Sequence, residues 1–235
     1  MKKRAGDTLV EVALAVGIFS MVAITIVAVM VSSTSSAQTA LETTLAREEI
    51  DTQAEALRFI HSAYLEDEDS GYDTYSKIWK DIANIAIIPN PDGTNEYLNY
   101  PPSTCQEVLE SDVFKEHGFV IDPHALRNNP VKALVRYKYN STKFTIASTY
   151  PHLIYTENDE LVDEDSADSN LYRAEGIYVI AVKDSDTTQI VNSVNPTKSS
   201  GFYDFYIRTC WYGAGSKAPS VISTVIRLYN PPDID

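Results

Sequence analysis

The feature that most constrains this chain is an uninterrupted apolar run near its N-terminus. From Leu9 to Val31 there are 23 residues, and Glu11 carries the only formal charge among them. As an α-helix rising about 1.5 Å per residue, such a run covers a hydrocarbon core of roughly 30 Å. The run is therefore long enough to span a membrane as a single helix.

Two kinds of N-terminal segment share this pattern. A secretory signal peptide also starts with basic residues, but its apolar region usually lasts about 7–15 residues and ends at a small-residue cleavage site. Here the basic residues 2–4 precede a longer run, and Gly6 lies before it. A signal anchor with a cytoplasmic N-terminus fits the length but leaves Glu11 unexplained, because a carboxylate in an apolar run is costly and indicates a function.

The residues around Gly6 resemble the N-terminus of the type IV pilin and pseudopilin family. In that family a peptidase cuts after a glycine that follows a short basic leader, and the new N-terminus is methylated. A glutamate at the fifth mature position then pairs with the terminal amine of a neighbouring subunit. The residues that carry the resemblance are Gly6, Thr8, Leu9, Val10, Glu11, Ile18 and Phe19.

Carried onto this chain, the resemblance implies cleavage after Gly6, with Asp7 as the first mature residue and Glu11 as the fifth. The chain departs from the family at Asp7, where an apolar residue such as phenylalanine is usual. The other residues of the implied assembly segment are Thr8, Leu9 and Val10.

The resemblance also implies an assembly pathway. The partners would be other pilin subunits, a prepilin peptidase and an inner-membrane assembly platform, and no cofactor is implied. The chain would first be a single-pass membrane protein with its head outside the cytoplasm, and would then join a pilus or pseudopilus at the cell surface. Its large head favours a minor pilin or a pseudopilin, serving adhesion, motility, DNA uptake or secretion.

The helical pattern continues beyond the apolar run. No Gly or Pro occurs from Ile18 to Leu65, and after the Ser/Thr-rich residues 32–36 apolar residues recur three or four positions apart. This spacing predicts one helix of about 55 residues whose second half presents a single apolar stripe. The residues of the predicted stripe are Leu41, Leu45, Ile50, Ala54, Leu57, Ile60 and Tyr64.

The rest of the chain predicts an α+β head. We divide the chain into a leader (1–6), a membrane or filament-core half-helix (7–32), an amphipathic half-helix (33–66) and a head (67–235) with an antiparallel sheet packed on the long helix. Apolar spacing predicts a second helix over 75–88 and a short helix over 105–116, opened by Ser103 or Thr104. Alternation predicts a hairpin of strands 133–139 and 143–147, a weaker strand at 152–155, and strands 176–182, 202–211 and 221–229.

The composition limits the function further. The leader holds 3 of the 19 basic residues, so cleavage leaves 16 against 33 acidic residues, a formal charge of −17. Such a surface repels nucleic acid phosphates, and no direct nucleic acid binding is expected. Cys105 and Cys210 are the only cysteines, and they form either a disulfide or two buried thiols. Export by the N-terminal anchor favours the disulfide.

No residue pattern in the sequence indicates catalysis. The four histidines show no HExxH spacing, and no GxSxG, P-loop or GxGxxG motif occurs. The acidic run 157–170 offers Asp163, Asp165 and Asp168 as calcium candidates, but it lacks the EF-hand glycine and glutamate, so a solvated loop is favoured. We therefore expect no enzyme. The alternative to a filament subunit is a membrane-anchored extracellular binding protein or adhesin that does not polymerise.

Overall fold

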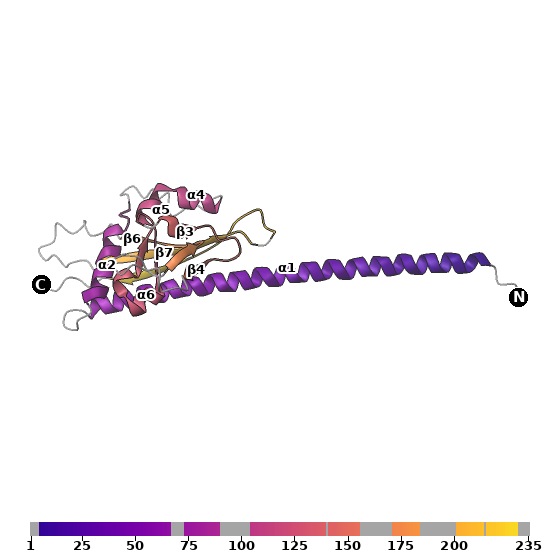
Figure 1. Ribbon diagram of the computed structural model, residues 1–235, viewed down its shortest axis with the longest axis horizontal. Helices are drawn as coiled ribbons and strands as arrows, with labels where there is room; N and C mark the ends of the chain where they lie inside the picture. Colours follow the sequence, from indigo (N-terminus) through magenta and orange to yellow (C-terminus); the bar gives the residue numbers. More distant parts are fainter. Residues whose placement is uncertain are drawn as a thin grey trace, which may run out of the picture. The chain divides into compact units, whose positions relative to one another are not determined.

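The computed structural model describes residues 5–66, 73–89, 104–139, 141–155, 171–183, 201–213 and 215–229 (Figure 1). The chain divides into two units, residues 1–42 and residues 43–235. As predicted, the fold class is α+β, with a long N-terminal helix and an antiparallel sheet in the C-terminal part. We call residues 43–235 the head.

Helix α1 spans Ala5–Leu65 and runs unbroken through the Ser/Thr-rich residues 32–36. Its predicted end at Leu65 is confirmed. Within the head, α1 turns one stripe inward, as the three-to-four spacing predicts. Leu41 does not belong to this stripe, because its side chain is 59% exposed. The buried residues of the stripe are Ala46, Ile50, Gln53, Ala54, Ala56, Leu57, Ile60 and Ala63.

The remaining helices are short. The predicted second helix ends three residues early, because Ile87 leaves it to form a bridge with Val182 of the sheet. The predicted helix over 105–116 is two helices that break at Ser111, whose side chain caps the second one. Thr104 caps the first, as expected. The helices are α2 (Asp73–Ile85), α4 (Cys105–Glu110), α5 (Asp112–His117), α6 (Pro123–Asn128), η1 (Pro130–Lys132) and η2 (Ser141–Lys143).

An antiparallel sheet of five strands forms the centre of the head, in the order β2-β1-β6-β7-β8. The predicted strands 176–182, 202–211 and 221–229 are confirmed to within one residue at each end, and the last two form the predicted hairpin. The alternation in β7 is also confirmed, since Phe205 and Ile207 are fully buried. The strands are β1 (Phe119–Ile121), β2 (Leu134–Arg136), β6 (Ile177–Lys183), β7 (Phe202–Trp211) and β8 (Ser220–Tyr229).

The predicted hairpin of residues 133–139 and 143–147 is wrong. Strand β2 pairs with β1, and β3 (Phe144–Thr145) pairs in parallel with β5 (Leu171–Glu175) in a second sheet. The predicted strand 152–155 is confirmed as β4 (His152–Tyr155), which is antiparallel to β5. Strand β1 is only three residues long, which is too short to show an alternating pattern. The sequence therefore does not reveal that β1, and not residues 143–147, pairs with β2.

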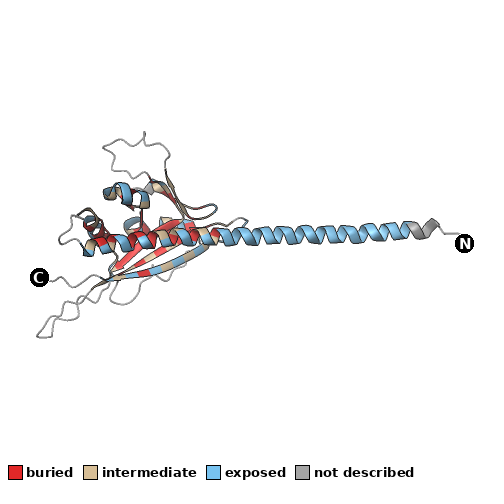
Figure 2. Ribbon diagram, turned by 90° about the horizontal axis from the view of Figure 1, so that it is seen from below, coloured by how far each residue is buried: buried red, intermediate tan, exposed pale blue. Residues whose placement is uncertain are grey.

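Both faces of the central sheet are covered. The stripe of α1 and the apolar face of α2 pack on one face, around Leu57, Trp79 and Phe205. Helix α5 and the second sheet pack on the other face, around Phe114 and Tyr178. Figure 2 shows the buried residues in red along the strands and the part of α1 within the head. Strand β6, covered on both sides, is therefore a continuous apolar run.

One buried polar side chain joins α1 to the sheet. Gln53 is fully buried, and its Nε2 donates to the carbonyl oxygen of Ile121 at 2.7 Å. The Ile121 N–H donates back to Gln53 Oε1 at 2.8 Å. Strand β6 pairs with β1 only at Phe119, so the Gln53 amide takes the place of a neighbouring strand beside Ile121. This pair of bonds sets where α1 lies against the sheet.

Replacing Gln53 with leucine tests this joint. The variant leaves the N–H and C=O of Ile121 buried without partners, and each such group costs about 1–3 kcal/mol. We expect Gln53→Leu to lower the free energy of unfolding by about 2–4 kcal/mol. The measurement is urea denaturation with the disulfide intact, followed by the fluorescence of the buried Trp79 and Trp211.

The matched control is Gln106→Leu, since Gln106 is exposed on α4 and its side chain donates to Glu110 of the same helix. We expect a change below about 0.5 kcal/mol for this surface substitution. Equal unfolding curves for the two variants would show that the Gln53 bonds do not hold the helix on the sheet.

Candidate assembly interface

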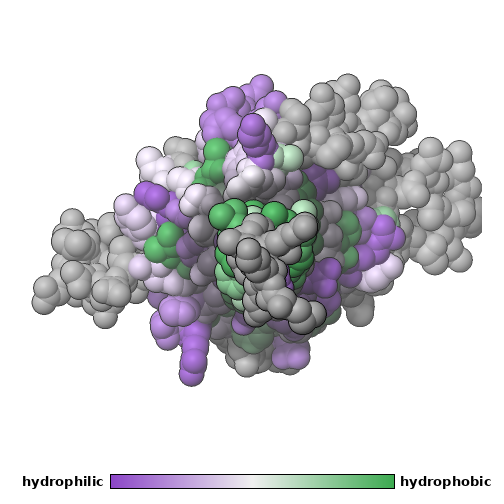
Figure 3. Space-filling model, turned by 90° about the vertical axis from the view of Figure 1, so that its right-hand side faces the viewer, coloured by the Kyte–Doolittle hydropathy of each residue, from purple (hydrophilic) through white to green (hydrophobic). Residues whose placement is uncertain are grey.

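The first unit of the chain exposes an apolar helix on all sides. Every residue from Leu9 to Leu41 is exposed, and Leu9 and Phe19 are each 74% exposed. Large apolar side chains occupy positions all around the helix, which turns about 100° per residue. Figure 3, with the N-terminal end of this helix towards the viewer, shows hydrophobic residues in green above and beside the grey N-terminal atoms.

A helix that is apolar all round is stable only when something apolar covers it. Fully burying one large apolar side chain is worth about 1.5–3 kcal/mol, so the run from Leu9 to Val31 represents on the order of tens of kcal/mol. Among the described residues, one helix is long and apolar enough to cross a membrane, and it is this one. The surface is therefore fit for a lipid environment or for the interior of a helical assembly.

Several hydroxyl groups of this helix bond to its own backbone. Ser20 Oγ donates to the carbonyl oxygen of Val16 at 2.8 Å, and Thr25 Oγ1 donates to that of Val22 at the same distance. Thr34 makes the equivalent bond to Met30. In a medium without water an unsatisfied hydroxyl is costly, so these bonds suit an apolar environment.

The predicted processing and assembly residues lie in the first turns of α1. Gly6, Asp7 and Thr8 fall within the helix, which begins at Ala5. Leu9, Val10 and Glu11 follow them and are exposed. Within the described part of the chain, no side chain forms a hydrogen bond or ion pair with Glu11. Its carboxylate is thus available to a partner that approaches through the apolar surface.

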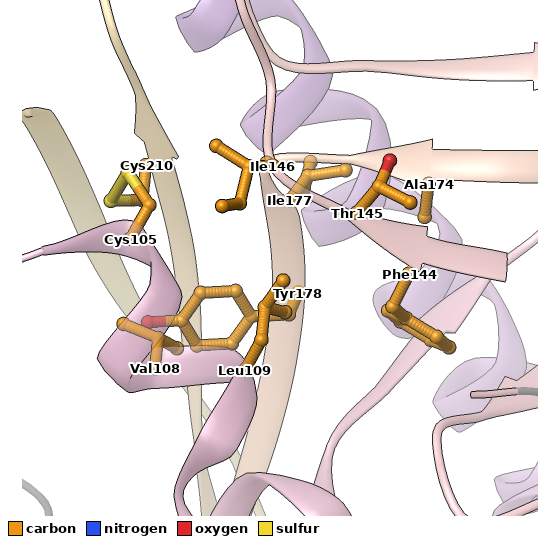
Figure 4. Close-up of a pocket in the computed structure, with 11 residues that line it drawn as sticks. Cys105, Val108, Leu109, Phe144, Thr145, Ile146, Ala174, Ile177, Tyr178 and Cys210 are labelled. Atoms are coloured by element: carbon orange, nitrogen blue, oxygen red, sulfur yellow. A yellow bond between two sulfur atoms is a disulfide. The ribbon is translucent and has the colours of Figure 1, made fainter. Parts of the chain in front are cut away.

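The second predicted feature, the disulfide, is present. The Cys105 and Cys210 sulfur atoms are bonded, with 5.6 Å between the Cα atoms (Figure 4). The bridge joins the start of α4 to β7 across a sequence separation of 105 residues. On the chain-entropy model, closing such a loop stabilises the fold by about 4–5 kcal/mol. The alternative of two separate buried thiols is excluded.

The space beside the disulfide is not a ligand pocket. The cavity in Figure 4 has a volume of about 10 Å³, and Val108, Phe144 and Tyr178 are among the residues that line it. A cavity of this size holds about one water molecule. The disulfide therefore belongs to the packing of the head.

The predicted calcium candidates Asp163, Asp165 and Asp168 lie outside the described residues. Within the described ranges, no group of three His, Cys, Asp or Glu side chains is arranged to share a metal ion.

A second cluster of polar groups was not found from the sequence. Glu49 of α1 lies beside Leu153 and Tyr155 of β4. The Leu153 N–H donates to its carboxylate. Burial raises the pKa of Glu49, and the neighbouring Glu48 adds to this rise, while His152 and the Leu153 bond oppose it. Glu49 therefore carries a carboxylate that its surroundings compensate only in part.

Aromatic rings and a buried carboxylate complete this cluster. The His124 ring stacks on Tyr155, with 4.2 Å between the centroids. Asp122 is fully buried and caps α6, accepting hydrogen bonds from the N–H groups of His124 and Ala125. Burial, together with the charges of Asp122 and Glu49, raises the pKa of Tyr155 above its ordinary value. The signals in the sequence were the Asp122-Pro123 helix start and the histidines, but nothing in it places them beside Glu49.

No protein-family model, curated protein or solved structure matches this chain. We therefore infer its function from its own residues.

The raised pKa of Glu49 predicts a pH-dependent stability. The Glu49 carboxyl keeps its proton to a higher pH in the folded chain than in the unfolded chain, where its pKa is about 4.3. The resulting stabilisation is complete below that value and is lost as the pH rises through the folded pKa. Glu49→Gln removes the charge and keeps an oxygen acceptor for Leu153. We expect the variant to be more stable than the unmodified protein near neutral pH, with the difference vanishing towards pH 4.

The measurement is urea denaturation at a series of pH values between about 4 and 8, on either side of the unfolded pKa. Asp81→Asn serves as the control, because Asp81 is exposed on α2 and its substitution changes the net charge equally. A Glu49→Gln difference that does not depend on pH would show that burial of this carboxylate does not affect stability.

Proposed function

We propose that this protein is a structural subunit of a type IV pilus or related filament, as a minor pilin or a pseudopilin. It is inserted in the membrane with its basic leader in the cytoplasm and its head outside. A prepilin peptidase cleaves after Gly6, and an assembly platform extracts the subunit into the filament. There, the apolar surface of residues 9–31 packs against the same surface of neighbouring subunits.

The observation that carries this proposal is the combination of an exposed apolar helix with one carboxylate near its start. Glu11 is the only charged residue in the run, and it lies five residues after Gly6. A plain membrane anchor has no use for this charge. A filament subunit does, because cleavage after Gly6 creates a terminal amine that can pair with Glu11 of a neighbour.

The physical role of Glu11 follows from its surroundings. A charge-assisted hydrogen bond between an ammonium and a carboxylate is strong in a medium of low dielectric constant. An isolated carboxylate there is costly. Glu11 thus favours one axial alignment of neighbouring subunits, in which its carboxylate contacts the Asp7 amine of a neighbour.

The disulfide supports the proposed location of the head. Structural disulfides form and persist in oxidising compartments such as the periplasm or the cell surface. The Cys105–Cys210 bridge lies in the head, which the proposed topology places outside the cytoplasm.

Mass spectrometry of the N-terminal peptide tests processing. We expect the protein from sheared surface fractions to begin at Asp7, with or without a methyl group on its amine. Protein from native membranes should contain both the cleaved and the uncleaved forms. A chain that begins at Met1 in every fraction would contradict the proposal and favour the anchored binding protein.

Glu11→Ala tests assembly. The substitution removes the only charge of the run and leaves its length unchanged, so membrane insertion should be retained. We expect the amount of the subunit in sheared filaments to fall at least about tenfold, the equivalent of about 1.4 kcal/mol per subunit. The measurement is quantitative immunoblotting of the sheared and membrane fractions.

Asp81→Ala is the matched control, because it removes one exposed acidic side chain from the head. It should not change either fraction. If Glu11→Ala reaches the filament as well as this control does, Glu11 does not have the proposed role.

A further inference from the structure

A groove runs along the head beside α1. It consists of two hollows, of about 720 Å³ and 200 Å³, which share Glu48, Thr52 and Pro123. The larger hollow is an open depression between α1 and α6. The smaller one lies between α1, α6 and β4 and ends at Glu49 and Tyr155. We call the two together the α1–α6 groove.

The groove is acidic on the side that α1 forms. Glu48, Glu49, Asp51 and Glu55 line it, and Arg47 is the only Lys or Arg among the lining residues. Glu55 also forms an ion pair with Arg58, which leaves three carboxylates against one guanidinium. Such a surface attracts a cationic partner and repels an anionic one.

The floor of the larger hollow is apolar. Phe59 is 46% exposed, and its ring packs edge-on against Tyr75 at a centroid distance of 5.2 Å, which limits its movement. Leu126 and Pro123 of α6 lie in the same hollow. A held, half-exposed aromatic ring beside aliphatic side chains is typical of the anchor points of protein interfaces. The groove therefore fits a partner with both apolar and basic side chains.

The smaller hollow is suited to one basic side chain. The residues that line it include Glu49, Tyr150, Tyr155 and His124. Ammonium and guanidinium groups bind favourably to carboxylates and to the faces of aromatic rings. Within the described chain, His152 and the Leu153 N–H favour the Glu49 carboxylate, and they offset its burial only in part. A lysine or arginine side chain entering the hollow would supply the missing charge.

We propose that the α1–α6 groove binds a basic, amphipathic segment of a partner protein, with one lysine or arginine side chain held beside Glu49. Its apolar residues contact Phe59 and Leu126, and its other basic residues face Glu48 and Asp51. This inference does not depend on filament assembly. It applies equally to a filament subunit and to an anchored binding protein.

The test uses the full-length protein in neutral detergent micelles. The probe is a fluorescein-labelled hexapeptide of four lysines and two leucines, and binding is measured by fluorescence anisotropy, with empty micelles as the blank. We expect saturable binding that weakens steeply as salt is added, because exposed charges are screened over about 10 Å at 0.1 M salt. The corresponding peptide of four glutamates and two leucines should not bind.

Matched variants locate the site. Glu48→Gln/Glu49→Gln should weaken binding of the lysine peptide about tenfold, or about 1.4 kcal/mol. Glu107→Gln/Glu110→Gln makes the same charge change on exposed positions of α4 and should alter binding less than about twofold. Phe59→Ala should weaken binding without changing the net charge, which separates the apolar contact from the electrostatic one.

Three results would overturn the proposal. Equal losses in the two charge variants would indicate attraction to the acidic surface as a whole. Unchanged binding by Phe59→Ala would exclude the apolar contact. Concentration-dependent self-association that only the Glu48→Gln/Glu49→Gln variant loses would make a second copy of this chain the occupant. The N-terminal peptide and Glu11→Ala experiments measure processing and incorporation into filaments, and not peptide binding. This proposal and the filament assignment therefore fail independently.

Discussion

The structure depends first on an apolar surface that this chain does not cover. Residues 9–31 expose large side chains on every side of α1, and none of them is buried by a described part of the chain. Water is a poor solvent for this surface, so a membrane or neighbouring helices must supply the missing contacts. The hydroxyl groups of Ser20 and Thr25 bond to the backbone of the helix, which suits an environment without water. Glu11 is then the one strongly polar side chain of the run.

The same helix obeys a different rule within the head. From Ala46 onward only one stripe is buried, because the sheet covers α1 from one side. Gln53 shows how closely helix and sheet are matched, since its amide completes the hydrogen bonding of Ile121 where no strand does. The Cys105–Cys210 bridge holds the opposite layer to β7. The head thus holds residues 43–65 of α1 in a defined position against the sheet.

Two carboxylates on α1 link the proposals. Glu11 lies in an apolar surface, and Glu49 is half-buried at the end of a groove, where its pKa is raised by burial. Neither is fully compensated by the described chain, and an ammonium or guanidinium group is the natural partner of each. In the proposed filament, that partner of Glu11 is the terminal amine of a neighbouring subunit. In the proposed groove complex, the partner of Glu49 is a basic side chain of another protein. One long helix would then recognise two partners through the same chemistry.

The sequence by itself determined features that are local in the chain: the end of α1 at Leu65, the alternation of β7 and the acidic charge. The first two are set by the spacing of side chains along one helix or strand, and the third by composition. Only the tertiary structure decided the pairing of β2 with β1, the parallel pairing of β3 with β5, and the burial of Gln53 and Glu49. Gln53 lies 68 residues from Ile121, and β1 has three residues. Contacts between such distant or short segments depend on which surfaces compete for them in the folded chain, and no local period records the outcome.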